Sequence, residues 1–364
     1  MDKGMKIAIN TGGGDAPGLN AVIEAVVMAA YNRHWEVYGI KNGYAGLLDT
    51  DEIIHLTPDK VRHISNLGGT IIGTTNKGNP FKMPVTNMAG ETGIRDVSDK
   101  VVENFKRLCF DCLIAVGGDG SIQIAYDFYK KGIPVICVPK TIDNDLGATV
   151  ITFGFDTAVS IATEAIDRLH STAKSHDRVM VVEVMGRTAG WIALNSGLSG
   201  AADVILIPEI PFDINRVCEH IMAGELHGQR YAIVVVAEGA VPAGGTFIDK
   251  GKGEIGRQEV VLGGVGEFVA RKIAEKTGKD TRSMVLGHLQ RGGSPTTFDR
   301  LISLRFGAAA VRMVEAKNFG TMVSLEPPEM KAVPLEDVIG NIKRVPVNSD
   351  SIKTAREIGI SFGD

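Results

Sequence analysis

The sequence of 364 residues lacks several features that would mark a specialised class of protein. It contains no apolar run of the roughly 20 residues that a bilayer-spanning helix needs, so we expect no membrane segment. Its formal net charge of -4 gives no reason to expect nucleic acid as a partner. The N-terminus, MDKGMKIAIN, also lacks the long apolar stretch of a signal peptide.

Cysteine is scarce, and its spacing completes no metal site. Cys109 and Cys112 have the spacing of a zinc knuckle, yet no second pair and no nearby His-x-x-x-His accompanies them. We therefore expect buried thiols beside a strand. Reduced thiols and the missing signal peptide together predict a cytoplasmic protein.

Two common phosphate-binding fingerprints are missing as well. No G-K-[ST] occurs anywhere, and TGGGDAPG at 11–18 departs from G-x-G-x-x-G because Pro17 replaces the last glycine. Its three consecutive glycines precede a predicted helix, where backbone N–H groups could approach an anion closely. The same glycines would also suit a tight turn with no ligand, so this stretch alone leaves both interpretations open.

The sequence does contain a recurring unit: an apolar run, a glycine-rich turn and a helical pattern. Such units predict parallel sheets covered by helices, with ligands at the carboxyl ends of the strands. The runs lie at 6–10, 112–116, 179–184, 231–237 and 283–287. We predict an α/β fold of two Rossmann-like three-layer α/β/α domains with mainly parallel sheets and an active site in the cleft between them. The predicted domains are 1–154 with about 290–340, and 155–289 with about 341–364. Two stretches rich in Gly, Pro and charge, 76–96 and 240–262, are expected at the surface.

The stretch GGDGS at 117–121 isolates one carboxylate, Asp119, among glycines. A carboxylate beside bound phosphates is repelled unless it reaches a cation, so we interpret Asp119 as a Mg²⁺ ligand, directly or through water. The alternative is that Asp119 only caps the helix that follows.

The stretch PKTIDND places a lysine, a threonine and two aspartates at the predicted end of a buried strand. Period-two alternation would direct Asp143 and Asp145 to the same side. One would lie near the metal, and the other would accept a proton from a hydroxyl, as phosphoryl transfer requires. Lys140 and Thr141 would contact the moving phosphoryl group. The alternative is a turn favoured by Asn and Asp, which explains the asparagine better than the paired aspartates.

Basic residues at strand ends or in glycine-rich turns indicate a phosphorylated acceptor. An isolated arginine is usually a solvated surface residue, but the flanking glycines of HLQRGGSP suggest a constrained loop. Arginine is suited to hold a phosphate dianion, and Glu238 after an apolar run could accept hydrogen bonds from sugar hydroxyls. The basic residues are Arg178, Arg187, Arg282, His288 and Arg291.

Together these stretches resemble the 6-phosphofructokinase family. The resembling segments are GGGDAPGLNAVI, GGDGS, PKTIDND, MGRTAGW, PE at 208–209, EG at 238–239 and GHLQRGGSP, in the family's order and spacing. GGDG alone is a weak signal, since lipid kinases and NAD kinases have a similar turn, whereas the joint set is specific. The resemblance covers about 5–345. It implies the glycolytic, Mg²⁺-dependent transfer of a phosphoryl group to the 1-hydroxyl of fructose 6-phosphate, giving fructose 1,6-bisphosphate.

The resemblance also implies roles for individual residues. Asp143 would be the catalytic base, and Thr141, Arg187 and Lys140 would lie near the transferring phosphoryl group. Asp119 and Asp145 would be associated with the metal. The donor would be bound by Gly14, Tyr44, Asn76, Lys77, Gly118, Asp119, Gly120 and Ser121. The sugar phosphate would be bound by Thr141, Asp143, Asp145, Arg178, Met185, Gly186, Arg187, Glu238, Arg282, His288 and Arg291. In bacterial members the residues matching Arg178 and Arg282 come from a neighbouring subunit, which implies a homotetramer, or at least a homodimer, with shared active sites.

Two positions give opposite indications about the donor. Pyrophosphate-dependent members usually have Asp where this sequence has Gly120, and its side chain obstructs the α-phosphate of a nucleotide. Lys140, in contrast, is typical of pyrophosphate users. Steric exclusion decides more firmly than an added lysine, so we predict ATP, with pyrophosphate as the alternative. Asn76 replaces an arginine that bridges the phosphates in well-known bacterial enzymes, and Ile124 replaces a small glycine near the adenine.

Regulation is expected to differ from that of the familiar bacterial enzymes. Two arginines of their effector pocket correspond to Glu24 and Met28, and basic positions near 227–229 are His227 and Gln229. An anionic effector would meet less positive charge, so we predict weak or absent control by ADP or phosphoenolpyruvate.

Two other classes of protein are alternatives. An oxidoreductase would use TGGGDAPG as a dinucleotide turn, but this leaves the three aspartates unexplained, and no obvious acidic ribose anchor follows about 20 residues later. A non-catalytic nucleotide sensor is disfavoured because the candidate base and metal residues are intact.

Overall fold

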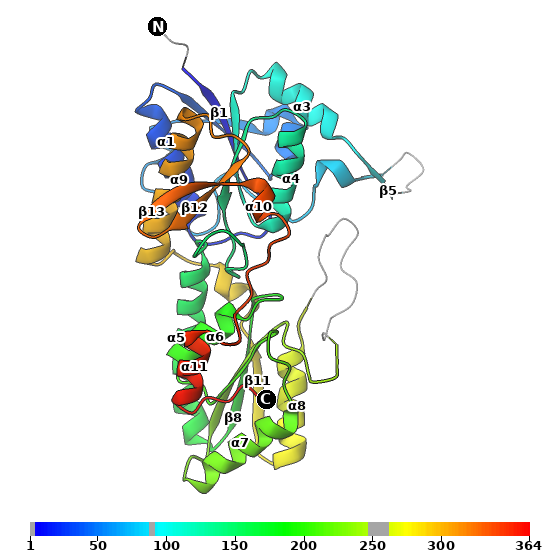
Figure 1. The fold of residues 1–364 in the computed structure, drawn as a ribbon, viewed down its shortest axis with the longest axis vertical. Coiled ribbons are helices and arrows are strands. Elements are labelled where there is room, and N and C mark those ends of the chain that lie inside the picture. Colours follow the sequence, from blue (N-terminus) through cyan, green and yellow to red (C-terminus); the bar gives the residue numbers. More distant parts are fainter. Residues whose placement is uncertain (1–3, 87–91, 247–261) are drawn as a thin grey trace.

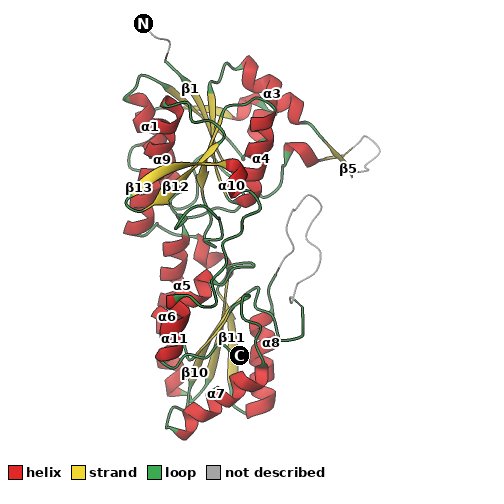
Figure 2. Cartoon of the chain, in the orientation of Figure 1, coloured by secondary structure: helices red, strands yellow, loops and turns green. Residues whose placement is uncertain are grey.

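A computed structural model describes residues 4–86, 92–246 and 262–364. It contains two main sheets, arranged one after the other along the long axis and each covered by helices (Figures 1 and 2). The predicted α/β fold class with mainly parallel sheets is confirmed. The expected surface stretches overlap the gaps, so 87–91 and 247–261 lie outside the described residues.

The first sheet has seven strands, and its five central strands are parallel. In spatial order they are β13 (Glu329–Pro334), β12 (Thr321–Glu326), β7 (Val135–Pro139), β6 (Cys112–Gly117), β1 (Lys6–Thr11), β2 (Glu36–Ile40) and β3 (Ile53–Leu56). The edge strands β13 and β3 are antiparallel to their neighbours. From β1 the chain continues to β2 on one side of the β1–β6 pair, and from β6 it continues to β7 on the other side. The winding therefore reverses between β1 and β6, and a crevice opens at the carboxyl ends of such a pair.

Helices cover both faces of this sheet. On one face α1 (Leu19–Tyr31) and α9 (Thr297–Glu315) pack on β1 and β6, and on the other face α3 (Ser98–Arg107) and α4 (Asp119–Lys130) pack on the same strands. Every residue of β6 and β7 is buried, which explains their uninterrupted apolar sequences. The smaller elements are α2 (Pro58–Val61), α10 (Leu335–Val338), the hairpin of β4 (Met83–Thr86) and β5 (Thr92–Arg95), and the 3₁₀ turns η1 (Ala45–Leu47), η2 (Thr50–Glu52) and η3 (Pro80–Lys82).

The second sheet has four parallel strands. In spatial order they are β11 (Thr281–Val285), β8 (Val179–Val184), β10 (Ala232–Ala237) and β9 (Val204–Leu206). One face is covered by α5 (Phe155–Ser175), α6 (Trp191–Ser199) and α11 (Asp350–Glu357), and the other by α7 (Ile214–Leu226) and α8 (Val265–Thr277). The 3₁₀ turn η4 (Gly287–Arg291) follows β11.

The chain passes between the two parts more than once. After β11 it returns to the first part as α9, and the segment between α10 and α11 brings it back to the second part (Figure 1). We propose that the domain boundaries follow the sheets, as 1–154 with about 290–340 and 155–289 with about 341–364.

The cysteines are free, and one differs from expectation. Cys112, Cys137 and Cys218 are buried, but Cys109 is exposed, so the prediction of buried thiols was wrong there. Cys109 has a φ of 55° in the turn that follows α3, which carries it to the surface. Within the described ranges, no helix combines the length and apolar character needed to cross a bilayer.

Candidate active site

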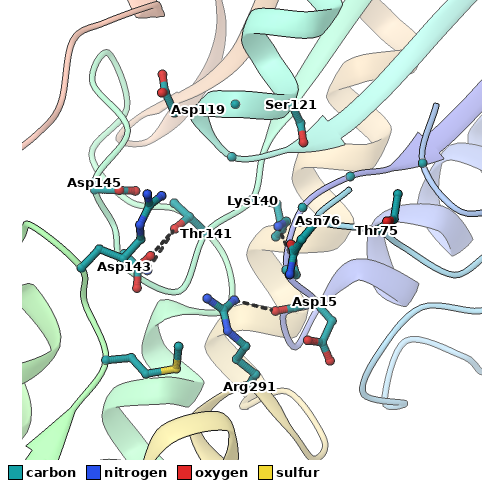
Figure 3. Close-up of a pocket in the computed structure, with 18 of the residues that line it drawn as sticks. Asp15, Thr75, Asn76, Asp119, Ser121, Lys140, Thr141, Asp143, Asp145 and Arg291 are labelled. Atoms are coloured by element: carbon teal, nitrogen blue, oxygen red, sulfur yellow. Dashed lines mark hydrogen bonds between the residues drawn. The ribbon is translucent and has the colours of Figure 1, made fainter. Parts of the chain in front are cut away.

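A cavity of about 420 Å³ lies at the carboxyl ends of strands from both sheets. The turns after β1, β6 and β7 line it from one side, and the turns after β8, β10 and β11 from the other. Figure 3 shows the carboxylates, Lys140 and Arg291 around this space. Of the predicted site residues, all line the cavity except Arg178, Gly186 and Arg282.

The triple glycine after β1 lies close to neighbouring side chains. A Cβ on Gly12 would lie 2.6 Å from Ser121 Oγ, and a Cβ on Gly14 would lie 2.7 Å from Arg291 Nη1. Gly13 has a φ of 79°, and its N–H donates to Thr75 O at 3.1 Å. The helix α1 begins at Leu19, so residues 15–18 separate its N-terminus from the glycines. Geometry therefore accounts for these glycines whether or not an anion binds.

The turn after β6 leads directly into α4. Gly118 is the N-cap of α4 and no side chain caps this end, so the alternative that Asp119 caps the helix is not realised. Asp119 is exposed at the first helical position and lines the cavity. The Tyr44 hydroxyl donates to Ser121 O at 2.9 Å, which attaches this turn to the segment after β2.

Lys140 joins the turn after β7 to the turn after β1. It is 3% exposed, its N–H donates to Gly117 O at 2.9 Å, and its Nζ donates to Gly14 O. Burial, reinforced by the positive charge of Arg291, lowers the pKa of Lys140 to about 8. A cation is thus held between the two glycine-rich turns after β1 and β6, where a polyphosphate would be attracted.

The two aspartates of PKTIDND reach the cavity by a turn, so the predicted extended strand end was wrong. β7 ends at Pro139, and Asn144 has a φ of 51°, which breaks period-two alternation. Asp143 N–H donates to Thr141 Oγ1 at 3.1 Å within the turn. The turn favoured by asparagine is therefore the correct description, and it still places Asp143 and Asp145 on the cavity.

The carboxylates sit in an environment that disfavours their charge. Asp143 is 3% exposed, and no described residue donates a hydrogen bond to its Oδ1. Burial raises the pKa of Asp143 above its ordinary value, against the opposing attraction of Arg291. Burial and the charge of Asp143 raise the pKa of Asp145 to about 6, and burial also raises the pKa of Glu238. Among the described residues, Asp143 Oδ1 is therefore left open to a ligand or to solvent.

On the other side of the cavity, backbone N–H groups hold the polar side chains in place. Arg187 N–H donates to Glu238 Oε1 at 3.0 Å, and Arg187 itself has a φ of 52°. Met185 N–H donates to Gln290 Oε1 at 2.9 Å. Arg291 Nη1 donates to Asp15 O at 3.0 Å, linking η4 to the turn after β1.

Arg178 and Arg282 lie at the amino ends of β8 and β11, away from their own chain's cavity. Both pair with Asp280, at 2.5 Å from Arg178 Nε and 2.7 Å from Arg282 Nη1. Gly186 forms the turn after β8 with a φ of 139° but does not line the cavity. The cavity of a single chain therefore lacks these three predicted site residues.

The residues of the predicted effector region also lie outside the cavity. Glu24 Oε2 accepts a hydrogen bond from Ser65 N–H at 2.8 Å, so its carboxylate is already used within the chain. Gln229 Nε2 donates to Asp203 Oδ1, and His227 Nδ1 lies 2.8 Å from Ala223 O.

Sequence reasoning missed several cavity residues. Glu183, buried in β8, accepts from Gly266 N–H at 2.8 Å, and a charge inside the apolar run VMVVEV was the available signal. Gln290 does not line the cavity, but its side chain supports Met185 there, and it lies in the quoted motif HLQRGGSP. Asp15 follows the three glycines of TGGGDAPG, so the reasoning that selected Asp119 applied to it as well, whereas Thr75 carried no distinguishing signal.

A family model described as phosphofructokinase matches residues 6–314. The chain belongs to the phosphofructokinase family. This phosphofructokinase is 49% identical to an ATP-dependent 6-phosphofructokinase of Chloroflexus aurantiacus, with 100% of this chain and 99% of the relative covered. It is 48% identical to ATP-dependent 6-phosphofructokinase 2 of Clostridium perfringens, with 99% and 98% covered.

Solved structures of phosphofructokinases have the same fold. The T-state crystal structure from Pichia pastoris matches with a TM-score of 0.80 and 30% identity, covering 99% of this chain and 37% of that much longer one. A pyrophosphate-dependent phosphofructokinase from Marinobacter aquaeolei matches with a TM-score of 0.78 and 24% identity, covering 98% and 88%. At this identity the second match shows the fold alone.

Proposed function

We propose that this phosphofructokinase transfers the γ-phosphoryl group of ATP to the 1-hydroxyl of fructose 6-phosphate, giving fructose 1,6-bisphosphate in a Mg²⁺-dependent reaction. The observation that carries the proposal is Asp143, whose buried Oδ1 has no donor within the described part of the chain. The names of relatives that are nearly 50% identical over their full length support the same activity.

Asp143 would act as the general base. A carboxylate whose pKa is raised by burial accepts a proton more readily than an ordinary one, which suits removal of the hydroxyl proton during attack. Arg187 and Lys140 would offset the negative charge of the phosphoryl group in flight, and Thr141 would orient it. Lys140, Thr141 and Asp143 are buried, which strengthens their electrostatic interactions.

The donor set fits Mg²⁺. Among the described residues no group of three or more His, Cys, Asp or Glu side chains is placed to hold a metal, but Mg²⁺ is commonly held by one or two carboxylates together with substrate phosphates. Asp119 and Asp145 line the same cavity and would supply the carboxylates. When bound, the ion would neutralise charge on the phosphate oxygens.

The donor side would bind the nucleotide through Gly14, Tyr44, Asn76, Lys77, Gly118, Gly120 and Ser121. The acceptor side would bind fructose 6-phosphate through Met185, Arg187, Glu238, His288 and Arg291, with Gly186 shaping the turn. Arg178 and Arg282 point to a second copy of the chain, because they lie at the opposite end of the sheet from their own cavity. We therefore propose a homodimer or homotetramer with shared sites, acting in the cytoplasm.

Pyrophosphate is the second candidate donor, favoured by Lys140. The deciding experiment measures fructose 6-phosphate phosphorylation with ATP and with pyrophosphate side by side, each with Mg²⁺. We expect the larger kcat/KM with ATP. A preference for pyrophosphate would contradict the proposed donor, and no turnover with either would contradict the proposed function.

A further inference from the structure

The segment 341–345, which we call the strap, follows the family-matched region 6–314 and runs between α10 and α11 (Figure 1). It pairs with the active-site loop that carries the aspartates. Gly147 N–H donates to Asn341 O at 2.9 Å, Leu146 and Ile342 form an isolated antiparallel bridge, and Lys343 N–H donates to Asp145 O at 2.8 Å. The strap thus attaches to the backbone of a proposed metal ligand.

The Lys343 side chain makes three hydrogen bonds to the same loop. Its Nζ donates to Asn144 Oδ1 at 2.8 Å, Val150 O at 2.9 Å and Thr149 O at 3.0 Å. Because an ammonium group has three donors, its capacity is used completely. Asn144 also accepts a hydrogen bond from Thr152 N–H at 3.1 Å, so its side chain is fixed from two directions.

Asn144 is the residue that sets the course of the loop. It lies between Asp143 and Asp145, and its φ of 51° sends the backbone out of the extended direction. A left-handed conformation at a residue other than glycine persists only where surrounding contacts hold it. Lys343 supplies a charge-assisted contact of this kind, which is stronger than a neutral hydrogen bond.

On its other side the strap is bound to the part of the chain that contains the four-stranded sheet. Trp191 Nε1 donates to Lys343 O at 2.9 Å, and the indole ring lies 5.9 Å from Nζ. Val345 N–H donates to Glu209 Oε1 at 2.9 Å, and the same carboxylate accepts from Gly190 N–H at 3.0 Å. Gly190 ends the turn that carries Arg187, so one short segment contacts the loops of both halves.

On the basis of the proposed function, we propose that Lys343 is a positioning residue that holds Asn144, and thereby the two aspartates, against the acceptor half of the site. It does not touch the reacting atoms. Its loss should lower kcat, because misplacing the base by about 1 Å costs on the order of 100-fold in rate. The KM for fructose 6-phosphate should change little, because His288 and Arg291 come from η4 and not from this loop.

The first test compares Lys343→Met with Lys353→Met, which removes an exposed lysine on α11. We expect kcat to fall at least about tenfold in the first variant, with KM for fructose 6-phosphate within about twofold, and neither to change in the second. Methionine keeps an unbranched side chain of similar length and removes the positive charge together with its three donors. A wild-type kcat in a folded Lys343→Met protein would overturn the inference while leaving the proposed function intact.

The second test asks whether Lys343 acts through Asn144. Asn144→Gly keeps the positive φ accessible and removes the acceptor, so it should lower kcat to a similar degree, and the double variant should be no worse than either single one. If the two substitutions lower kcat additively, Lys343 does not act through Asn144 and the inference is overturned. If Lys343→Met fails to fold, the comparison of Asn144→Gly with wild type decides, and an unchanged kcat there would overturn the inference.

A third measurement is independent of activity. In Lys343→Met the amide hydrogens of 144–152 should exchange faster than in wild type, whereas Lys353→Met should leave them unchanged. Equal exchange in all three proteins would overturn the inference. Absence of turnover in wild type would instead contradict the proposed function, so the two failures are distinguishable.

Discussion

The two sides of the cavity present polar groups in different ways. The side formed by the seven-stranded sheet combines glycine turns, where a Cβ at Gly12 or Gly14 would crowd neighbouring side chains, with charged side chains from the turns after β6 and β7. The side formed by the four-stranded sheet presents long charged side chains, among them Arg187, Glu238 and Arg291. The first side, which we call the glycine side, therefore adds close backbone approach to its charges, and the second side, which we call the charged side, contacts a ligand mainly through side chains.

This difference shows how two phosphorylated ligands can be distinguished within one cavity. A polyphosphate needs room for the backbone to approach several oxygens, so substitutions on the glycine side should act sterically. A sugar phosphate needs discrete charges and hydrogen-bond acceptors, so substitutions on the charged side should act electrostatically. Asp143 lies where the two sides meet.

The largest effect is expected at that junction. Asp143→Asn keeps the size of the side chain and removes the base, so kcat should fall by about 100-fold to 10,000-fold. Steady-state rates with ATP and fructose 6-phosphate give the loss, and circular dichroism checks the fold. Asp127→Asn is the matched control and should retain activity, because this carboxylate on α4 pairs with Lys130 and does not line the cavity. Unchanged turnover in Asp143→Asn would favour the nucleotide-sensor alternative.

The glycine side can be tested by adding bulk and charge. Gly120→Asp should lower kcat/KM for ATP by roughly 10-fold to 100-fold, because the carboxylate would repel and obstruct the nucleotide phosphates. The KM for fructose 6-phosphate should change little. Gly224→Asp on α7 is the control, since a Cβ there meets no atom closer than 3.8 Å. Equal losses in kcat/KM for ATP and for fructose 6-phosphate would contradict the proposal that the two substrates bind to different sides of the cavity.

Arg282 tests whether a second copy of the chain contributes positive charge to the site. If Arg282 serves a neighbour's site, Arg282→Ala should raise the KM for fructose 6-phosphate roughly tenfold, about the loss expected for one charge-assisted hydrogen bond of 1.5–3 kcal/mol. Arg271→Ala, on the exposed face of α8, should have no effect. Sedimentation measures the assembly. An unchanged KM for fructose 6-phosphate in an assembled enzyme would contradict a role of Arg282 in binding this substrate.

The smallest effect on activity, and a measurable one on stability, is expected where α5 and α9 meet behind the cavity. Asp299 is fully buried and accepts hydrogen bonds from Thr157 N–H at 2.7 Å and Thr157 Oγ1 at 2.6 Å. Burial nevertheless raises its pKa to about 6 from 3.8. The folded state therefore binds this proton more tightly than the unfolded state, and the stabilisation present below about pH 4 is lost as the pH rises through 6.

Asp299→Asn removes this titration. Between pH 4 and 7 the unfolding free energy of wild type should fall, relative to the variant, by on the order of 3 kcal/mol. Denaturant unfolding of both proteins across that range measures the difference, and subtraction removes the contributions of Asp145 and Glu238. Parallel pH profiles would contradict the raised pKa.

Much of the fold could be predicted from local pattern. The uninterrupted apolar runs and glycine turns predicted parallel strands at the right places, because strands buried on both faces need such sequences. Asp119, Asp143 and Asp145 could be selected because carboxylates among glycines at strand ends have few structural reasons to be there. The extended geometry assigned to PKTIDND was wrong because one asparagine in a left-handed conformation overrides strand alternation.

The sequence by itself determined the α/β class, the family and the acidic residues on which the chemistry depends, since these are properties of short stretches. Only the tertiary structure decided which stretches share a cavity. It joined Lys140 to Gly14 and Arg291 to Asp15, brought Lys343 to Asn144, and left Arg178 and Arg282 at the opposite end of their sheet. These contacts connect residues up to 276 positions apart, and their geometry depends on how two sheets pack, which no local pattern specifies.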